Sequence, residues 1–294
     1  MRPWDEVLEL TRHCEATGWD GVYFADHFMP NGSDVTPLDG DTLECWSVLA
    51  GLASAVPRLR LGPLVSSVTC RHPAVLAKIA AAVDQISHGR LLLGIGAGWQ
   101  ENEHRAYGIE LGTVKERLDR FEEACQVIRS LLREPRTTFA GHYYRLKDAP
   151  NQPPPVQERL PLLIGGGGEK RTMRIAARYA DEWNTWTSPD ELAHKVDVLH
   201  RHCAEIGRDP SEIRVSTQAM LFLSKDEQWL ASQRTSDIGR VGVIGTPPQV
   251  VDIIGQYRKA GADEFIVSDW NFGPMSRRKD TCDLFIEEVA AHVR

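Results

Sequence analysis

The sequence of 294 residues lacks several features that would assign it to a class at once. It carries 34 lysines and arginines against 41 aspartates and glutamates, a formal net charge of −7. This acidic balance argues against a nucleic-acid partner, because binding to a phosphate backbone depends on clustered cations. No run of about 18 apolar residues is present, and the N-terminal stretch MRPWDEVLEL has no apolar signal-peptide core. We therefore expect a cytoplasmic protein without a membrane partner.

Motifs of metal, disulfide and hydrolytic chemistry are also missing. Neither H-E-x-x-H nor G-x-S-x-G occurs, so metal catalysis and a serine hydrolase are disfavoured. No Schiff-base lysine is evident at a strand end, which weakens the case for a flavin-free barrel enzyme acting on a phosphorylated substrate. The cysteines form no C-x-x-C pair and read as reduced thiols, as expected in cytosol. They are Cys14, Cys45, Cys70, Cys125, Cys203 and Cys282.

The sequence does contain short apolar runs that alternate with helical segments. Most runs are apolar on both sides of the alternation, as in a parallel sheet covered on both faces. The strand candidates are Gly21–Ala25, Leu59–Leu64, Leu91–Ile95, Leu162–Ile164, Asp181–Thr185, Ile213–Phe222 and Glu264–Ser268. Repeated strand–helix units without a break in composition predict one α/β domain over residues 1–294.

Helix starts are marked clearly. Thr113, Ser188 and Thr246 are each followed three residues later by Glu or Gln, the pattern of a capping box. Proline at the first helical position predicts a helix over Pro73–Ser87. The first helix is expected over about Trp4–Ala16.

Two segments depart from a regular barrel. Residues 134–161 are polar and proline-rich, which predicts an insertion that forms a hairpin. Its strands are expected at Thr137–Phe139 and His142–Leu146, with the turn at Ala140–Gly141. The chain also opens on a helix, and the three residues before Trp4 are too few for a strand. We therefore expect a (β/α)8 barrel that lacks its first strand, or a sheet that is not a complete barrel.

Glycines follow two of the expected strands. Gly165–Gly168 precede a helix, where free amides and the helix dipole favour a phosphate. A structural turn is the alternative interpretation. Gly94, Gly96 and Gly98 alternate after another strand, which permits close approach of a flat or anionic ligand or simply a tight turn. The spacing is not the dinucleotide fingerprint, because the third glycine comes one position early.

Polar and aromatic residues follow the other strands. Asp26 and His27 follow the first strand, where the imidazole is suited either to proton transfer or to a structural hydrogen bond. The hydroxyl-rich segment Val65–Cys70 offers cofactor contacts or helix capping. Trp183 and Asn184 end another strand, where an indole forms either a ligand wall or core. A glycine-lined site with aromatic residues and one histidine suits a flavin-like cofactor.

Taken together, these motifs resemble the luciferase-like monooxygenase superfamily, and more narrowly its branch of F420-dependent oxidoreductases. The resemblance covers nearly the whole chain, and the combined order of the pieces is more specific than any one of them. The matching stretches are Gly18–Phe28, Arg71–Lys78, Gly89–Trp99, Ile164–Thr172, Arg178–Asn184 and Ile244–Pro247.

The resemblance implies a barrel with an insertion and a reduced deazaflavin or FMN at the carboxyl ends of the strands. It places the cofactor phosphate on the amides of Gly167 and Gly168, within Gly165–Gly168, and makes His27 the acid or base beside the cofactor. Phe28 and Trp99 become candidates for the substrate wall. The further cofactor contacts it implies are Val65, Ser66, Thr69, Gly96, Ala97, Gly98, Trp183 and Asn184.

One departure from the pattern of the family narrows the class of substrate. Relatives that oxidise sugar phosphates tend to carry Glu at the position of Trp99 and Trp at the position of Asn31. We therefore expect a coenzyme F420-dependent oxidoreductase that transfers a hydride to or from another organic substrate. An FMN-dependent monooxygenase that uses O2 is the alternative, and a non-catalytic or truncated member is the second. Relatives imply a homodimer.

Overall fold

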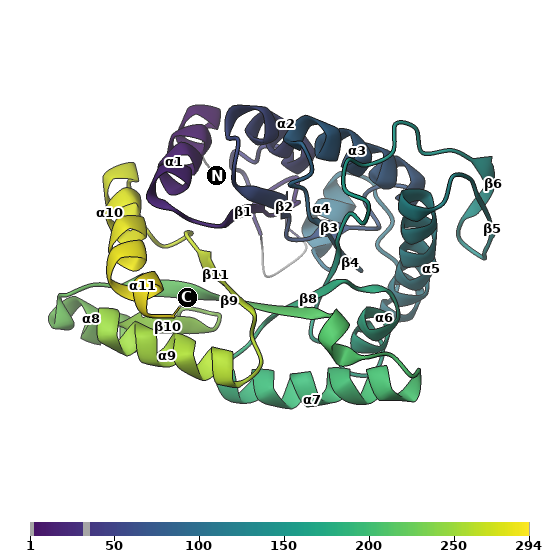
Figure 1. The fold of residues 1–294 in the computed structure, drawn as a ribbon. Coiled ribbons are helices and arrows are strands. Elements are labelled where there is room, and N and C mark those ends of the chain that lie inside the picture. The colour runs from purple at the N-terminus through teal and green to yellow at the C-terminus, as the bar shows by residue number, and fades with distance from the viewer. Residues whose placement is uncertain (1–2, 32–35, 294) are drawn as a thin grey trace. The chain divides into compact units, whose positions relative to one another are not determined.

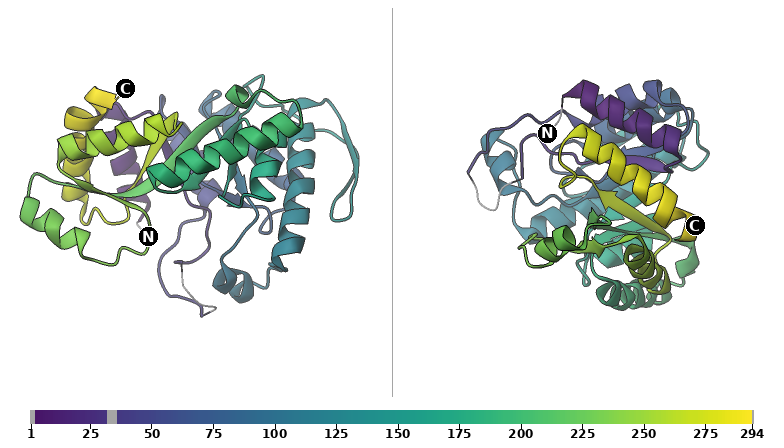
Figure 2. Two further views of the ribbon diagram at one scale, coloured as in Figure 1. Left: turned by 90° about the horizontal axis from the view of Figure 1, so that it is seen from below. Right: turned by 90° about the vertical axis from the view of Figure 1, so that its left-hand side faces the viewer.

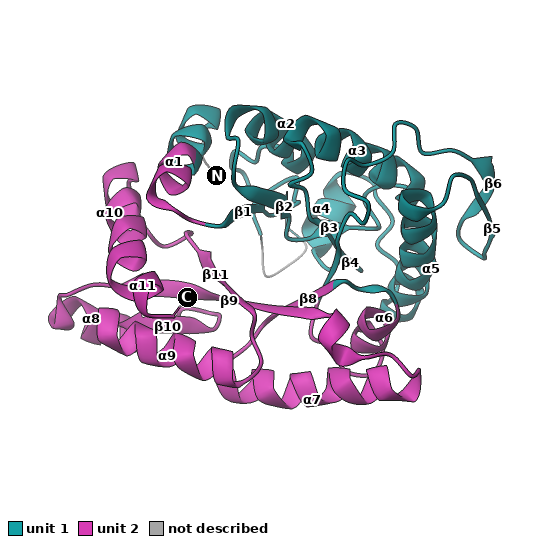
Figure 3. Ribbon diagram, in the orientation of Figure 1, with its two compact units in different colours: residues 1–11, 20–165, 179–181 teal, residues 12–19, 166–178, 182–294 magenta. Residues whose placement is uncertain are grey.

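The computed structural model describes residues 3–31 and 36–293, coloured along the chain in Figure 1. They fall into two compact units (Figure 3). Unit 1 comprises residues 1–11, 20–165 and 179–181, and unit 2 comprises residues 12–19, 166–178 and 182–294. The expectation of a single domain with an insertion stays a prediction.

The helices are α1 (Trp4–Thr17), α2 (Cys45–Ala55), α3 (Pro73–Ser87), α4 (Glu101–Ala106), α5 (Val114–Arg133), α6 (Thr172–Tyr179), α7 (Pro189–Glu205), α8 (Glu227–Arg234), α9 (Pro247–Lys259), α10 (Met275–Phe285) and α11 (Ala291–Val293). A 3-10 turn covers Pro210–Glu212, and a π-helical turn covers Ile286–Ala290. The strands are β1 (Gly21–Phe24), β2 (Arg60–Pro63), β3 (Ser66–Ser67), β4 (Leu93–Gly96), β5 (Thr137–Ala140), β6 (Arg145–Ala149), β7 (Leu162–Gly165), β8 (Glu182–Trp186), β9 (Arg214–Leu223), β10 (Gly242–Gly245) and β11 (Glu264–Ser268).

In unit 1 the strands β1, β2, β3, β4 and β7 form parallel pairs, and polar segments follow their carboxyl ends. β1 pairs with β2, and β4 pairs with β3 on one side and β7 on the other. A bridge between Leu61 and Leu91 links β2 to the residues before β4. The expected strand over Leu59–Leu64 is therefore present as β2, and β3 follows after a cis peptide between Leu64 and Val65.

In unit 2 the ten-residue strand β9 is the centre of a parallel sheet. It pairs with β8 through Arg214–Gln218, with β11 through Ser216–Met220 and with β10 through Met220–Leu223. Helix α9 packs on β10 and beside α7 (Figures 1 and 2). Strand β10 was not expected from the sequence, because four residues that begin and end in glycine carry too little apolar pattern to identify a strand.

Helix starts follow the expected chemistry. Thr113 and Glu116 form a complete capping box at α5, and Thr246 does the same with Gln249 at α9. Ser188 Oγ accepts the backbone N–H of Glu191 at α7. These pairs satisfy backbone donors that a helix leaves open at its first turn. The expected ranges of α1 and α3 agree with the structure to within one residue.

The expected hairpin is present as the antiparallel pair β5–β6, beside α5 in Figures 1 and 2. Its second strand begins at Arg145 rather than at the expected His142, because the Glu123 carboxylate accepts the intervening backbone N–H groups. These N–H groups belong to His142, Tyr143 and Tyr144, whose nitrogens lie 2.8–3.1 Å from the Glu123 carboxylate oxygens. A carboxylate on α5 therefore sets the shape of the turn.

Among the described residues, the first element is α1 and the first strand is β1, so no strand precedes Trp4 there. None of the described helices has the length and apolarity needed to cross a membrane. The same residues contain no group of three or more His, Cys, Asp or Glu side chains that could hold a metal ion.

Candidate functional site

His27 lies just after β1 and is held by a buried carboxylate from α4. Its Nδ1 is 2.9 Å from Glu103 Oε1, and Glu103 Oε2 accepts the backbone N–H of Phe28 at 2.9 Å. Glu103 is 1% exposed. Because an ionised carboxylate only accepts hydrogen bonds, the Nδ1 atom carries the proton in this pair and Nε2 is left to accept or deliver another.

The side chain of Trp99 lies against the same imidazole. The two rings are edge to face, with centroids 5.6 Å apart, and Trp99 is 49% exposed. Phe28 packs on Tyr107 with centroids 5.3 Å apart, and the Arg71 guanidinium lies 5.7 Å from the Phe28 ring. Trp99 thus places a half-exposed indole directly against the His27 ring.

Asp26, the residue directly before His27, belongs to a buried network of charged and polar side chains. Asp26 accepts a hydrogen bond from Ser66 Oγ at 2.6 Å and two from the Arg71 guanidinium. Arg71 also contacts Glu44 at 2.6 Å, and Trp46 Nε1 donates to Ser66 at 3.0 Å. Every charged group here is paired, as burial requires. The network joins the loop after β1 to β3 and α2.

Electrostatics within this network favour the ionised forms of Arg71 and Glu44. Burial opposes the charge on Arg71, but the adjacent Asp26 and Glu44 carboxylates raise its pKa above the ordinary value. Burial also opposes the charge on Glu44, and hydrogen bonds from Ser47 and Trp46 together with Arg71 lower its pKa. Arg71 and Glu44 therefore act as fixed charges that support the loop after β1.

Ser67 and Thr69 form a directed chain of hydroxyls that ends on a second histidine. Ser67 Oγ is 2.5 Å from Thr69 Oγ1, which is 2.6 Å from His104 Nε2. His104 Nδ1 is 2.6 Å from the carbonyl oxygen of Gln100, so Nδ1 donates and Nε2 of the neutral ring accepts from Thr69. These bonds fix which way each hydroxyl points.

The alternating glycines are explained largely by the side chains packed on them. A Cβ atom at Gly96 or Gly165 would lie 2.8 Å from a methyl group of Val65, and one at Gly98 would lie 2.4 Å from Ser67 Oγ. Gly98 also has a φ of +84°, which favours glycine. The glycines therefore let Val65 and Ser67 approach β4 and β7 closely.

The glycine loop that precedes α6 lies in unit 2, from Gly166 onward. Gly166 N–H donates to the carbonyl of Asn184 at 2.9 Å, whereas the amides of Gly167 and Gly168 donate to no protein acceptor within the described residues. A Cβ at Gly167 would lie 3.0 Å from Thr185 Oγ1. Lys195 Nζ donates to the carbonyl of Gly167 at 3.1 Å. Two open amides near a cation fit an anionic group such as a phosphate.

Trp183 and Asn184 lie below this loop and support it. Trp183 is fully buried, and its Nε1 donates to the carbonyl of Gly166 at 2.9 Å. Asn184 is 2% exposed, donates to Ser216 Oγ and accepts from Gln218 Nε2 at 3.0 Å. The side chains of both residues are committed to the protein interior, so they position Gly166 and its neighbours.

Three important residues escaped sequence reasoning: Glu103, Arg71 as the partner of Asp26, and Lys195. Glu103 lies 76 positions from His27 and Lys195 lies 28 from Gly167, so no local spacing reveals either contact. Only the fact that His27 and Glu103 both follow the carboxyl end of a strand could have suggested the first pair. Cys70, which follows Thr69, is an unreactive thiol, because burial raises its pKa to about 11.

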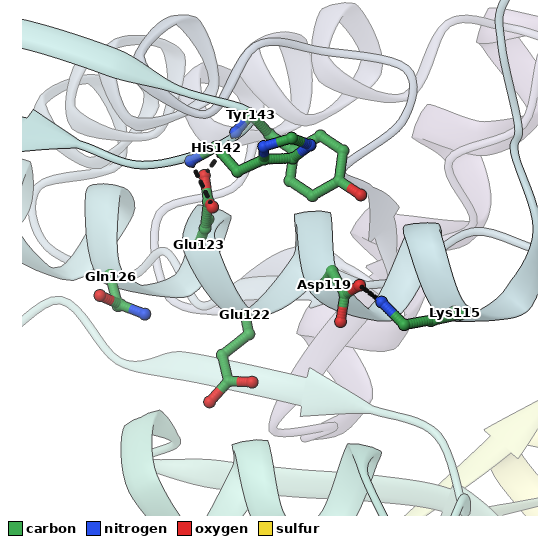
Figure 4. A pocket seen from close by; sticks show the side chains of 7 residues that line it. All are labelled: Lys115, Asp119, Glu122, Glu123, Gln126, His142 and Tyr143. Carbon is green, nitrogen blue, oxygen red and sulfur yellow. Dashed lines mark hydrogen bonds and ion pairs between the residues drawn. The ribbon is translucent and has the colours of Figure 1, made fainter.

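A separate hollow of about 500 Å³ lies on the surface of unit 1 between α5 and the turn of the hairpin (Figure 4). Its lining is acidic and polar, and Lys115 and Asp119 form an ion pair at 2.6 Å across one side of it. Glu123 is already engaged by the turn. This hollow contains none of the residues that sequence analysis selected.

Comparison with known proteins identifies the relatives. Residues 1–236 match the family model described as luciferase-like monooxygenase. The chain is 27% identical over 280 residues to F420-dependent hydroxymycolic acid dehydrogenase of Mycobacterium tuberculosis, a match that covers 92% of this chain and 72% of the relative. It spans 58% of three further curated mycobacterial relatives, at 30% identity.

Solved structures match the whole chain. An F420-dependent secondary alcohol dehydrogenase in complex with an F420–acetone adduct superimposes with a TM-score of 0.84 at 23% identity, covering 100% of this chain and 96% of that one. The monooxygenase RslO1 from Streptomyces bottropensis gives 0.82 at 20% identity, covering 99% and 94%. These similarities confirm the predicted α/β barrel fold of the luciferase-like class.

Proposed function

Because this chain belongs to the luciferase-like monooxygenase family, we propose that it is an oxidoreductase that transfers a hydride between coenzyme F420 and an organic substrate. The observation that carries the proposal is the buried Glu103–His27 pair at the end of β1. Oxidation of an alcohol to a carbonyl releases a proton together with the hydride, and reduction consumes one. An oriented imidazole beside the reacting carbon supplies that proton transfer.

The cofactor phosphate is assigned to the glycine loop. The amides of Gly167 and Gly168 have no protein acceptor within the described residues, and a Cβ at Gly167 would lie 3.0 Å from Thr185 Oγ1. Gly165 and Gly166 shape the loop, Trp183 and Asn184 support it, and Lys195 adds a cation beside Gly167. These features fit an anionic cofactor group.

The ring-contact residues are assigned to unit 1 and stay a proposal. They are Val65, Ser66, Thr69, Gly96, Ala97 and Gly98. Val65 is held against Gly96 and Gly165, and Ser66 is fixed by Asp26 and Trp46. Fixed side chains hold a planar ring in one orientation and exclude water from it. When bound, the deazaflavin supplies the hydride-transfer chemistry itself.

His27 is assigned the role of catalytic acid or base. Its Nδ1 proton is directed at Glu103, so Nε2 accepts a proton from a hydroxyl in one direction of the reaction and returns it in the other. A carboxylate behind an imidazole stabilises the charged ring that forms when it takes the proton. Phe28 and Trp99 are assigned to the substrate wall.

The substrate class follows from the relatives and one departure from them. Two relatives named for dehydrogenation act, by their names, on hydroxymycolic acid and on a secondary alcohol. A third, 32% identical over 196 residues, is named for glucose 6-phosphate. We infer an alcohol or carbonyl substrate for this chain. Trp99 stands where sugar-phosphate-oxidising relatives tend to carry Glu, so a sugar phosphate is not proposed. We also keep the predictions of a cytoplasmic homodimer without a nucleic-acid or membrane partner.

A titration with both cofactors tests the proposal. Oxidised coenzyme F420 added to the protein is expected to change its fluorescence with a dissociation constant in the micromolar range, whereas FMN binds at least tenfold more weakly, a difference of about 1.4 kcal/mol. Gly167→Val is expected to abolish binding through steric blocking, and Gly255→Val, on open space in α9, serves as the control. Absence of F420 binding at millimolar concentration would overturn the proposal.

An FMN-dependent monooxygenase is the second candidate. It is favoured by the family description and by the similarity to the monooxygenase RslO1. The same phosphate loop would accept FMN, so the loop does not distinguish the two. Oxygen uptake that depends on substrate and reduced FMN, and that is absent with the reduced deazaflavin, would establish this candidate instead.

A further inference from the structure

Two tryptophans and an arginine form a cluster at the carboxyl ends of strands in unit 2, which we call the Trp–Arg cluster. Trp186 is the last residue of β8, and Trp270 follows β11 by two positions. Both strands pair with β9 in parallel. The indole centroids are 5.8 Å apart, with planes inclined by 33°. Arg240 lies over both rings, 5.1 Å from the centre of Trp186 and 5.5 Å from that of Trp270.

The backbone around Arg240 fixes its position. Asp237 accepts the N–H of Gly239 at 2.9 Å, and Gly239 adopts a φ of +64°, which closes a turn directly before Arg240. The next residue, Val241, accepts the N–H of Met220 from β9. Val241, directly after Arg240, thus attaches the turn to the sheet. The Asp237 side chain closes the turn on the other side of Arg240. Arg240 is therefore presented to the two indoles by an anchored turn.

The charge of Arg240 has no carboxylate partner within the part of the chain that the structure describes. Its guanidinium makes cation–π contacts with the two indole rings. These contacts leave its N–H groups available to donate hydrogen bonds. Trp270 is 51% exposed, one of the larger apolar side chains that the fold leaves on the surface. An exposed indole beside an unpaired guanidinium is typical of a recognition surface, since both groups are enriched there.

Near Trp270 in the sequence, two polar side-chain atoms also lack a hydrogen-bond partner among the described residues. Ser268 Oγ and Asn271 Oδ1 are buried and have no hydrogen-bond partner among the described residues. Asn271 Nδ2 donates to the carbonyl of Leu221 at 2.7 Å, so the loop that carries Trp270 is attached to β9. Buried polar atoms without partners are uncommon in folded proteins, and an ordered water or a polar group of a ligand can satisfy them.

We propose that the Trp–Arg cluster binds the substrate through a carboxylate attached to a flat or apolar body. A guanidinium fork matches a carboxylate with two parallel hydrogen bonds, and the indole faces accept the apolar part. This inference rests on the proposed function only in calling the ligand the substrate, because binding is measured without cofactor or turnover. It narrows the alcohol or carbonyl substrate to one that also carries an acid group.

Isothermal titration calorimetry of the full chain with three isosteric probes tests the proposal. The probes are 4-phenylbutyrate, 4-phenylbutanol and 4-phenylbutylamine, with inorganic phosphate as an anion without an apolar body. The acid is expected to bind about tenfold more tightly than the alcohol, as a charge-assisted pair provides. The amine and inorganic phosphate are expected to bind more weakly than either. Equal affinity for acid and alcohol, or equal affinity for the acid and inorganic phosphate, would overturn the proposal.

Variants locate the site. Arg240→Gln is expected to remove the preference for the acid while leaving the alcohol unaffected, and Trp270→Ala to weaken both by about tenfold. Arg277→Gln is the matched control, because Arg277 makes the same kind of contact in the same unit, 4.6 Å from the ring of Trp229 instead of the two indoles of the cluster. An acid preference that survives Arg240→Gln contradicts the inference. Thermal midpoints equal to that of the unaltered protein show that each variant folds.

Failure of this inference and failure of the proposed function are separable. If the acid binds through Arg240 but no F420-dependent turnover is found, the proposed function falls and the binding site stands. If F420-dependent turnover is found with neutral alcohols and Arg240→Gln leaves KM unchanged, the proposed function stands and the inference about the cluster is wrong.

Discussion

At the scale of single residues, the site depends on charges that are paired over long distances in the sequence. His27 could be selected from its place after the first strand, but Glu103 could not, since nothing in the sequence around α4 marks its partner. The same holds for Arg71, which stabilises Asp26 across 45 positions. When one partner of such a buried ion pair is removed, the free energy of unfolding falls by several kcal/mol.

The first prediction concerns the Glu103–His27 pair. Glu103→Gln keeps the size of the side chain and removes its charge, so we expect turnover to fall at least about tenfold while the affinity for coenzyme F420 is unchanged. His27→Ala is expected to lower turnover further. Single-turnover hydride transfer to the best ketone from a screened panel measures both.

Glu101→Gln is the matched control, because Glu101 is an exposed residue at the start of the same helix. If Glu103→Gln weakened cofactor binding as strongly as turnover, Glu103 would be a structural residue. Rescue of turnover in Glu103→Asp would support the role of positioning the imidazole.

The second prediction concerns Cys70. Burial raises its pKa to about 11, so thiolate is scarce at neutral pH and increases tenfold with each unit of pH up to that value. We expect the rate of Cys70 alkylation by iodoacetamide, followed by mass spectrometry of its peptide, to rise steadily from pH 7 to at least pH 10. A rate that levels off near pH 8.5, as for an unfolded cysteine peptide, would contradict the predicted burial.

At the scale of helices and strands, local chemistry decided most boundaries. Capping residues set the starts of α5, α7 and α9, and the apolar runs located all seven expected strands. Strand β10 was missed because its pairing with β9 and not its own composition makes it a strand. The turn of the hairpin was misplaced because the residue that shapes it, Glu123, belongs to α5. The local sequence around β10 or around the turn reveals neither contact.

The third prediction concerns that turn. Glu123→Ala removes the acceptor of three backbone N–H groups. We expect faster hydrogen exchange at residues 142–144 and a loss of about 1–3 kcal/mol of local stability. Glu122→Ala, next to it on the same helix, is the control. Unchanged exchange in the turn would show that these bonds do not hold it.

At the scale of the whole molecule, the fold class and the family could be predicted from the sequence, whereas the support behind each site residue could not. Trp183 illustrates the difference. Its place at a strand end made it a candidate contact, but its side chain is fully buried and supports Gly166 from below. Position along a strand indicates which residues approach the site, and only the packed structure shows which of them present a side chain to it.

The fourth prediction concerns stability. A ligand that binds only the folded chain raises its stability by about 2.7 kcal/mol at one hundred times the dissociation constant. For a chain of this size we expect coenzyme F420 at that concentration to raise the thermal midpoint by roughly 5–10 °C. Differential scanning calorimetry measures the shift. Gly167→Val is expected to lose it, and a shift that persists in this variant would remove the phosphate from the glycine loop.

The packing of Val65 has a consequence for how this protein can vary. Its methyl groups occupy the space that a Cβ would need at both Gly96 and Gly165. A change at either glycine therefore depends on position 65: a homologue with alanine at position 96 or 165 should carry alanine or glycine at position 65. Any redesign of this region has to begin with Val65→Ala, because no larger residue at either glycine is tolerated before it.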